Sequence, residues 1–393
     1  MSTPETVQPD SLSPTPVQFA DDVPDLVGPD ADPAERWEVR PSDHRRPAAE
    51  RDEDLREPKF GTVFTDHLAH SVWTPGEGWH DRRIEPYGPI TLDPASSVLH
   101  YGQEVFEGLK AYRHANGAIR SFRPEQNARR FARSARRLAL PEITEDDFMG
   151  SLVALVRTDV DWVPDGEGTS LYLRPFMFAS ERYLGVRPGQ FVDYMVIASP
   201  VGPYFTHGFT PVAIWVSQDY HRAGPGGTGA AKCGGNYAAS LLPQQVAYAH
   251  GCEQVCFLDA ATRTLVEELG GMNIFVVGAD GSISTPALTG TILEGVTRAS
   301  IIQLLADAGR MVEERAITLA ELQDGIRSGA VAEVFACGTA AVITPIGRLK
   351  GEGFDLTVAD GTPGETTVAL HRQLTDIQYG RAEDPHGWMR RLV

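Results

Sequence analysis

One lysine lies in a stretch of small residues that could support covalent chemistry. Lys232 occurs in the run AAKCGGNYAAS, residues 230–240, and Tyr237 follows five positions later. A lone lysine is ordinarily a solvated surface charge, whereas flanking alanines and glycines indicate close packing. Partial burial disfavours the ammonium, and the free amine is the form that attacks a carbonyl to make a Schiff base. The spacing therefore leaves both a surface lysine and a catalytic lysine open.

The glycines before this lysine do not predict a nucleotide site. The run GPGGTG, residues 224–229, matches the GxGxxG pattern of dinucleotide-binding loops, and an apparent strand precedes it. Such a loop should open directly into a helix, but AAKCGG follows here. A Walker-type loop also fails, because Ala231 precedes Lys232 and Cys233 follows it, where that pattern requires glycine and then serine or threonine.

The cysteines favour neither a metal site nor a disulfide framework. Cys252 and Cys256 form a CxxxC pair with no second Cys or His pair placed to complete a tetrahedral site, so we expect buried structural thiols and no metal. Four cysteines in 393 residues, with no signal peptide before them, indicate a reducing cytoplasm. The sequence has no GxSxG and no HExxH motif, so acyl transfer and zinc hydrolysis lack their usual signals.

Composition limits the partners. Hydrophobic residues make up 42% and charged residues 22%, and no apolar run approaches the ~20 residues that span a bilayer. The net charge of −18 repels a polyanion, and no dense Lys/Arg tract offsets it. We therefore expect small-molecule substrates, no nucleic acid and no membrane.

The length of 393 residues is enough for two cores with a cleft between them. Residues 1–57 are rich in Pro, Asp, Glu and Ala and predict a disordered extension. Residues 58–200 predict a small α+β domain, and residues 201–212, with two prolines and two glycines, predict a linker. Residues 213–393 alternate strands and helices and predict a large domain that carries Lys232.

Local patterns place the main elements. Asn116 and Gly117 form a pair that is typical of a tight hairpin turn. Pro124 opens an amphipathic helix with apolar residues at three- and four-residue spacing, and EDDFMGSLVALVRTDV, residues 145–160, predicts another. In the second half we expect strands at AIWVSQ, EQVCFLD, NIFVVG and AEVFACG, and helices at VTRASIIQLLADAG and LAELQDGI.

Five motifs together resemble the branched-chain amino-acid aminotransferases, from about Phe60 to the C-terminus: LHYGQEVFEGLKAYR, AKCGGNY, EELGGMNIF, GVTRAS and CGTAAVITP. The resemblance implies a two-domain α/β (α+β) fold, that of the fold-type IV pyridoxal-phosphate enzymes, which is D-amino-acid-aminotransferase-like. It implies reversible ping-pong transfer of the amino group of L-leucine, L-isoleucine or L-valine to 2-oxoglutarate. Alternatives are a D-amino-acid aminotransferase or aminodeoxychorismate lyase on the same scaffold, and a binding protein that has lost the chemistry.

The resemblance gives three residues roles at the reacting part of the cofactor. Lys232 would form the Schiff base with pyridoxal 5'-phosphate and later move the substrate proton. Glu268 would pair with the pyridine nitrogen, and Glu267 would then point to the opposite face of its strand. Tyr237 would hydrogen-bond the 3' oxygen. Core packing or an edge-strand charge would be the ordinary interpretation of such residues without the motifs.

The resemblance also implies a phosphate site. Arg130 matches the arginine that clamps the phosphate, and Arg222 a second cationic contact. Val296 and Thr297 begin a helix whose first amides have no intrahelical acceptor, which suits an anion. Thr339 would add a hydroxyl donor.

On the substrate side, the resemblance implies an aromatic pocket for branched side chains, and burying such a side chain contributes about 1.5 to 3 kcal/mol. Arg174 would bind the second carboxylate of 2-oxoglutarate and withdraw for an aliphatic side chain. Ala340 would offer its amide to the substrate carboxylate. The pocket aromatics are Phe60, Tyr101, Phe106 and Tyr172.

Two departures refine the resemblance. Gly271 follows Gly270 where vertebrate members have a threonine, which is similar to the actinobacterial subgroup. The CxxC of the vertebrate mitochondrial enzyme falls on Ala341 and Thr344, so thiol regulation there is not expected. The family also implies a homodimer, in which Tyr101 and residues 184–186 reach the neighbouring active site.

Overall fold

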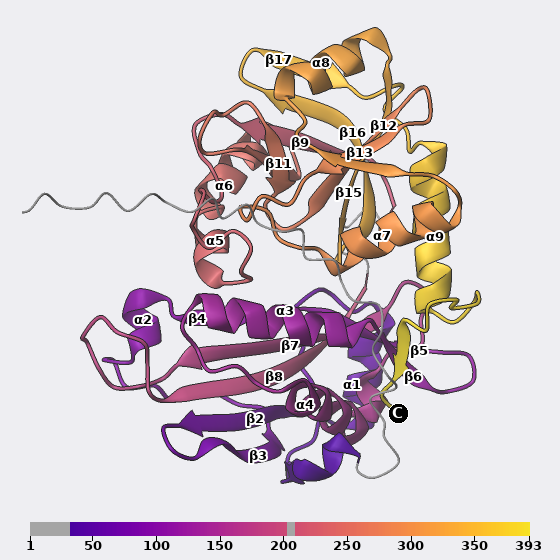
Figure 1. Cartoon of the computed structure of the whole chain (residues 1–393). Coiled ribbons are helices and arrows are strands. Elements are labelled where there is room, and N and C mark those ends of the chain that lie inside the picture. The colour runs from indigo at the N-terminus through magenta and orange to yellow at the C-terminus, as the bar shows by residue number, and fades with distance from the viewer. Residues whose placement is uncertain (1–31, 203–208) are drawn as a thin grey trace, which may run out of the picture. The chain divides into compact units, whose positions relative to one another are not determined.

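Two sheets carry most of the chain in this computed structural model, which describes residues 32–202 and 209–393 (Figure 1). The first sheet is antiparallel except for the parallel pair of β1 and β3. In spatial order its described strands are β1 (Glu38–Val39), β3 (Gly78–Pro86), β2 (His67–Thr74), β8 (Val192–Val201), β7 (Ser170–Ala179), β5 (Leu109–Arg113), β6 (Ile119–Phe122) and β18 (Met389–Arg391), with β4 (Glu104–Phe106) paired to β7.

The helices α3 (Pro124–Arg137) and α4 (Glu145–Thr158) pack on this sheet (Figure 1). The predicted start of α3 at Pro124 is confirmed, and Phe131 is completely buried between Phe148 and Tyr194. Thr144 caps α4, since its side chain accepts a hydrogen bond from the Asp147 amide. Apolar burial along both helices therefore builds the first core. The shorter described helices near this sheet are α1 (Ala48–Arg56), α2 (Ser97–Tyr101) and the 3₁₀ helices η1 (Pro33–Arg36) and η2 (Val160–Trp162).

The second sheet mixes parallel and antiparallel pairs, and β9 lies parallel to both of its neighbours. In spatial order its described strands are β11 (Val266–Leu269), β10 (Gln254–Leu258), β9 (Val212–Ser217), β16 (Val342–Gly351), β15 (Val331–Gly338), β12 (Asn273–Gly278), β13 (Ile283–Pro286) and β14 (Val312–Arg315), with β17 (Phe354–Thr357) paired to β16. The helices that follow its strands are α5 (Gly234–Ala238), α6 (Leu241–Ala249), α7 (Val296–Asp307), α8 (Leu319–Ser328) and α9 (Glu365–Gln378).

Separate apolar clusters stabilise the second sheet. One face buries Leu319, Leu322 and Ile326 of α8. Another cluster joins α7 and α9 to the sheet and also includes Trp388 and Met389 of the C-terminal segment. That segment returns to the first sheet as β18, which pairs with β6. The last described strand therefore belongs to the same sheet as the first described strand, β1.

The described part of the predicted N-terminal extension is folded. Trp37 is 3% exposed, and its indole contacts Tyr194 at 6.4 Å between ring centroids. The strand β1 pairs with β3, and η1 approaches α4 where Gly150 leaves room, since a Cβ there would lie 2.5 Å from the Pro33 carbonyl oxygen. The prediction of disorder over 1–57 is wrong for residues 33–56, because one aromatic anchor and an edge pairing hold a stretch without apolar periodicity. Residues 1–31 lie outside the described residues.

Most element predictions are confirmed. The hairpin of β5 and β6 turns at Gly117, whose φ is +83°. The predicted strands and helices of the second half all form, within about two residues of their expected bounds. All four cysteines are free and buried, as expected of structural thiols.

The chain passes from the first sheet to the second between residues 201 and 212, and the linker proposed there stays a prediction. The first sheet's β8 ends at Val201 and the second sheet's β9 begins at Val212, while residues 203–208 of the predicted linker lie outside the described residues. The division into domains at 58–200 and 213–393 stays a prediction. Residues Pro33–Val393 form one compact unit, within which both sheets contribute to the site described below. Among the described helices, none is both long and apolar enough to cross a membrane.

Candidate active site

The side chain of Lys232 meets Tyr237, as the sequence predicted them to share a site. The Lys232 amine donates a hydrogen bond of 2.8 Å to the Tyr237 hydroxyl and lies 4.8 Å from the centre of the Phe106 ring. The backbone is held from the first sheet's side, because the Lys232 amide donates to Ser134 Oγ on α3 and its carbonyl accepts from the Phe106 amide. The hydrogen bonds of its main chain and of its amine therefore fix the orientation of the Lys232 side chain.

Glu268 is a buried carboxylate on β11, 2% exposed. Its Oε1 accepts a 2.8 Å hydrogen bond from the Leu293 amide and forms a 2.8 Å ion pair with Arg222. Burial raises the pKa of Glu268 to about 7, against the opposing charges of Arg222 and Lys232. The neighbouring Glu267 has a different partner, the Thr291 hydroxyl. Glu268 is therefore an acid poised near neutrality beside the lysine.

Arg222 has contacts that differ from its predicted place at the phosphate. Its guanidinium pairs with Glu268 and donates to the carbonyl oxygens of Gly229 and Thr291, at 3.3 Å and 3.0 Å. A buried ion pair of this kind neutralises the carboxylate that would otherwise be desolvated alone. In the structure Arg222 is therefore a positioning residue for Glu268, and the motif match alone could not identify this partner 46 positions away.

Arg130 on α3 forms a bidentate pair with the fully buried Glu107, with N···O distances of 2.6 Å and 2.9 Å. Its third donor bond, 3.0 Å, goes to the Glu294 carbonyl oxygen, immediately before α7. Burial opposes the charge on Glu107, but Arg130, Lys232 and Asn127 hold its pKa below the ordinary value. The predicted phosphate clamp is thus anchored at the start of α7.

The first turn of α7, predicted as part of the phosphate site, is buried and lacks a side-chain cap. Val296 and Thr297 are 8% and 6% exposed, and the N-cap Gly295 has no side chain to bond their amides. Unpaired amides at a helix N-terminus favour an anion. Thr339 and Ala340 lie in the turn between β15 and β16, where the Ala340 carbonyl accepts a 2.9 Å hydrogen bond from Lys110.

The structure brings three of the four predicted pocket aromatics together with Arg174. The Arg174 guanidinium donates to the Tyr172 hydroxyl at 3.0 Å and lies 4.8 Å from the centre of the Phe106 ring. The Phe60 and Tyr172 rings pack edge to face, with 5.0 Å between their centroids. The fourth aromatic, Tyr101, does not join this group. Its side chain is 44% exposed, and its hydroxyl donates a hydrogen bond to the Leu184 carbonyl.

Three charged residues of the site region were not predicted, and two of them, Glu107 and Lys110, are buried. Glu104 accepts a hydrogen bond from the Gly234 amide beside Lys232, and its pKa is raised by burial. Glu107 holds Arg130, and Lys110 holds the Ala340 turn. All three occur in the apolar run EVFEGLKAY. A charge inside an otherwise apolar run was the signal for these residues, because burying a charge is costly unless a partner compensates for it.

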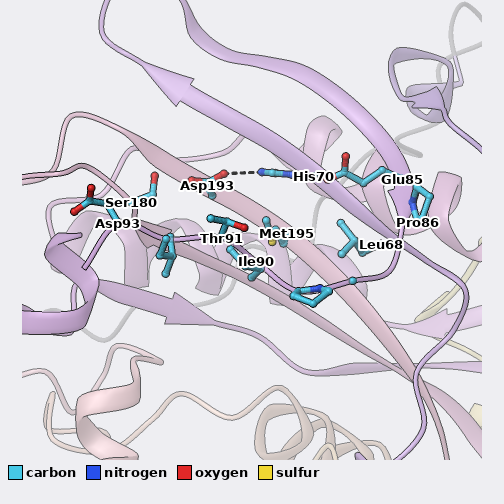
Figure 2. A pocket seen from close by; sticks show the side chains of 13 residues that line it. Leu68, His70, Glu85, Pro86, Ile90, Thr91, Asp93, Ser180, Asp193 and Met195 are labelled. Carbon is cyan, nitrogen blue, oxygen red and sulfur yellow. Dashed lines mark hydrogen bonds and ion pairs between the residues drawn. The ribbon is translucent and has the colours of Figure 1, made fainter. Parts of the chain in front are cut away.

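A hollow of about 510 Å³ lies elsewhere on the first sheet (Figure 2). His70 lies there between Glu85 and Asp193, at 2.7 Å and 2.6 Å. Leu68, Ile90 and Met195 form apolar wall, and the lining includes none of the predicted site residues. The ionisable groups His70, Glu85 and Asp193 of this hollow pair with one another, so we assign the chemistry to the Lys232 site.

Comparisons with known proteins agree with this geometry. The model of the family described as amino-transferase class IV matches residues 104–349. A branched-chain-amino-acid aminotransferase of Mycolicibacterium smegmatis is 56% identical over 88% of this chain and 95% of its own length. Branched-chain-amino-acid transaminase 1 of Bacillus subtilis is 47% identical over 84% of this chain and 92% of its own.

Solved structures give the same result. The branched-chain amino acid aminotransferase of Escherichia coli superposes with a TM-score of 0.69 at 30% identity, covering 83% of this chain and 100% of the other. The enzyme from Thermobaculum terrenum, solved in its PLP form, gives 0.67 at 25% identity over 84% and 98%. The chain belongs to the branched-chain-amino-acid aminotransferases of the class IV aminotransferase family.

Proposed function

We propose that this chain transfers the amino group of L-leucine, L-isoleucine or L-valine to 2-oxoglutarate, with pyridoxal 5'-phosphate attached to Lys232. Transamination of branched-chain amino acids and dependence on this cofactor follow from the family. The observation that carries the assignment of Lys232 is its amine, 2.8 Å from the Tyr237 hydroxyl, in a site that also holds a buried carboxyl with a pKa of about 7.

The residues present fit this cofactor by their chemistry. Lys232 offers a primary amine for a carbonyl, and Tyr237 a phenol for an oxygen next to it. Glu268 is a buried acid that suits a ring nitrogen, and the α7 amides at Val296 with the nearby Arg130 suit a phosphate. When bound, the cofactor withdraws electrons from the substrate Cα and so weakens its C–H bond.

The side chains then divide the work. With the cofactor bound, the Lys232 amine would act as the general base that takes the proton from the substrate Cα, and in the reverse half-reaction as the general acid that returns a proton to that carbon. The Tyr237 hydroxyl orients the Lys232 amine by accepting its hydrogen bond. Glu268 supplies charge at the ring nitrogen, and Arg222 keeps the carboxylate charged enough to do so despite its burial. The Ala340 amide binds the substrate carboxylate.

The pocket accounts for two kinds of side chain. Phe60, Phe106 and Tyr172 provide an apolar wall for a branched chain, and Arg174 lies against two of these rings. Arg174 Nε is buried without a hydrogen-bond partner, which is costly in the free protein. A second carboxylate in 2-oxoglutarate would satisfy this donor, and an aliphatic substrate would leave the guanidinium against the aromatic faces.

A homodimer is part of the proposal. Two segments, one around Tyr101 and one at residues 184–186, expose large apolar side chains. Leu99 is 58% exposed, Leu184 58% and Val186 86%. The hydrogen bond from Tyr101 to Leu184 joins these two segments into one patch. A second copy would cover the patch, with Tyr101 and residues 184–186 reaching its active site. A cytoplasmic location stays a prediction.

Substrate assays test the reaction. The purified protein should transaminate L-leucine with 2-oxoglutarate and should not act on D-alanine or aminodeoxychorismate at comparable rates. Activity with D-alanine or the lyase substrate alone would instead support another fold-type IV reaction, and failure with every branched L-amino acid would remove the proposed substrate.

A labelling experiment tests the lysine. Borohydride reduction of the loaded protein should fix the cofactor to the peptide that contains residues 230–240, and Lys232→Ala should lose both the label and turnover while its circular dichroism stays the same. Lys350→Ala is the control, since that lysine bonds the His250 carbonyl outside the site. Label on another peptide would show that Lys232 is the wrong residue.

A further inference from the structure

Lys110 is a buried lysine on β5, 8% exposed. Its ammonium donates a hydrogen bond of 2.9 Å to the Ala340 carbonyl oxygen. Burial lowers the pKa of Lys110 to about 8, because leaving water disfavours the charged form. A lysine is rarely kept at such a depth unless a partner or an incoming anion stabilises its charge.

Strand register places Lys110 on the face of the predicted pocket. In the antiparallel pair of β5 and β7, Lys110 lies directly opposite Tyr172, and in the pair of β4 and β7, Phe106 lies opposite Phe176. Facing residues share one side of a sheet, as do alternate residues of one strand. Lys110 therefore lies on the same face as Phe106, Tyr172 and Arg174.

The other end of the Lys110 contact belongs to the second sheet. Ala340 lies in the three-residue turn that joins β15 to β16, next to Thr339. The Lys110 hydrogen bond crosses from the aromatic wall to this turn and restrains the direction of its backbone groups. A positive charge is thereby held close to the amide that would receive the substrate carboxylate.

We propose that Lys110 is a positioning residue that sets the affinity of the site for the α-carboxylate. It acts through Ala340: the hydrogen bond fixes the turn, and the ammonium complements the incoming anion. This inference rests on the proposed role of Ala340 in the proposed function. Because amino-acid and oxo-acid substrates both carry the α-carboxylate, Lys110 affects both, whereas Arg174 serves only the substrate with a second carboxylate.

The test compares an anion with its neutral analogue on the loaded enzyme. For the Lys110→Met variant, competitive inhibition by 4-methylpentanoate should weaken by about tenfold or more, the usual effect of losing a charged hydrogen-bonding partner. Inhibition by 4-methylpentanamide, which has the same side chain and no charge, should change by less than about twofold. KM should rise by similar factors for L-leucine and 2-oxoglutarate, and kcat should change less.

Lys350→Met is the matched control, because it removes a lysine bond of 3.0 Å to the His250 carbonyl outside the site, and it should leave both inhibition constants unchanged. Lys110→Gln is the second variant if the methionine variant does not fold. An unchanged ratio of anion to amide affinity in a folded variant overturns the inference, and so does loss of folding in both variants, which would make the role structural. Loss of branched-chain transamination in the unaltered protein would instead refute the proposed function.

Discussion

Replacing Glu268 by glutamine tests the electrostatics of the site. The pKa of Glu268 rises from its ordinary 4.5 to about 7 on burial. A difference of one pKa unit corresponds to about 1.4 kcal/mol, so the charged carboxylate destabilises the folded chain by about 3 kcal/mol. Below pH 4.5 the group is protonated in both the folded and the unfolded chain, so it has no such effect. Between pH 4.5 and 7 the unfolded chain ionises first, and the folded chain loses stability as the pH rises.

The assay is urea unfolding of the cofactor-free protein at pH 5 and pH 8. The free energy of unfolding of the unaltered protein, relative to that of Glu268→Gln, should fall by about 2 to 3 kcal/mol from pH 5 to pH 8. Any pH-independent cost of leaving Arg222 without its partner cancels in this comparison. Glu352→Gln, at an exposed turn, should show no such change. A relative stability that is constant within about 0.5 kcal/mol would falsify the assignment of a raised pKa to Glu268.

Three further changes test other parts of the structure. Arg174→Met should raise KM for 2-oxoglutarate about tenfold or more and leave KM for L-leucine within about twofold in steady-state assays, and equal effects on both would contradict the assigned role. Arg222→Met leaves Glu268 buried without its cation and should lower the free energy of unfolding in urea by about 3 to 5 kcal/mol, whereas a loss below about 1 kcal/mol would show that the pair is unimportant. Phe131→Ala empties a fully buried position and should cost about 3 to 5 kcal/mol by the same measurement, with a smaller loss indicating that the core relaxes into the space.

Periodicity predicted the elements well because their burial is regular. The helix at Pro124 places Ala128, Phe131 and Ala135 on its buried face, and the structure buries all three. The motif match likewise placed Lys232 and Tyr237 in one predicted site, and in the structure the two side chains form a hydrogen bond. These features depend on the spacing of residues that are close in the sequence, and this spacing can be read without knowledge of the fold.

Features that depend on a distant partner were not accessible in this way. Residues 33–56 have a polar composition, and α1 buries none of its residues, so tertiary contacts such as those of Trp37 and the pairing of β1 with β3 are needed to reveal that the stretch is ordered. Arg222 was assigned to the phosphate, while the structure pairs it with Glu268 on β11. Glu107 and Lys110 were overlooked, although each is a charge within an apolar run, because their compensating contacts lie on α3 and in the turn after β15.

The pairing of β18 with β6 has a consequence for the order in which the protein can be assembled. Residues Met389–Arg391 leave the ribosome only after every strand of the second sheet has been synthesised. Until then the edge of β6 has unpaired backbone groups, and such an edge can pair with another chain. Nascent chains of this protein are therefore open to association with one another through the edge of β6 until β18 has been synthesised.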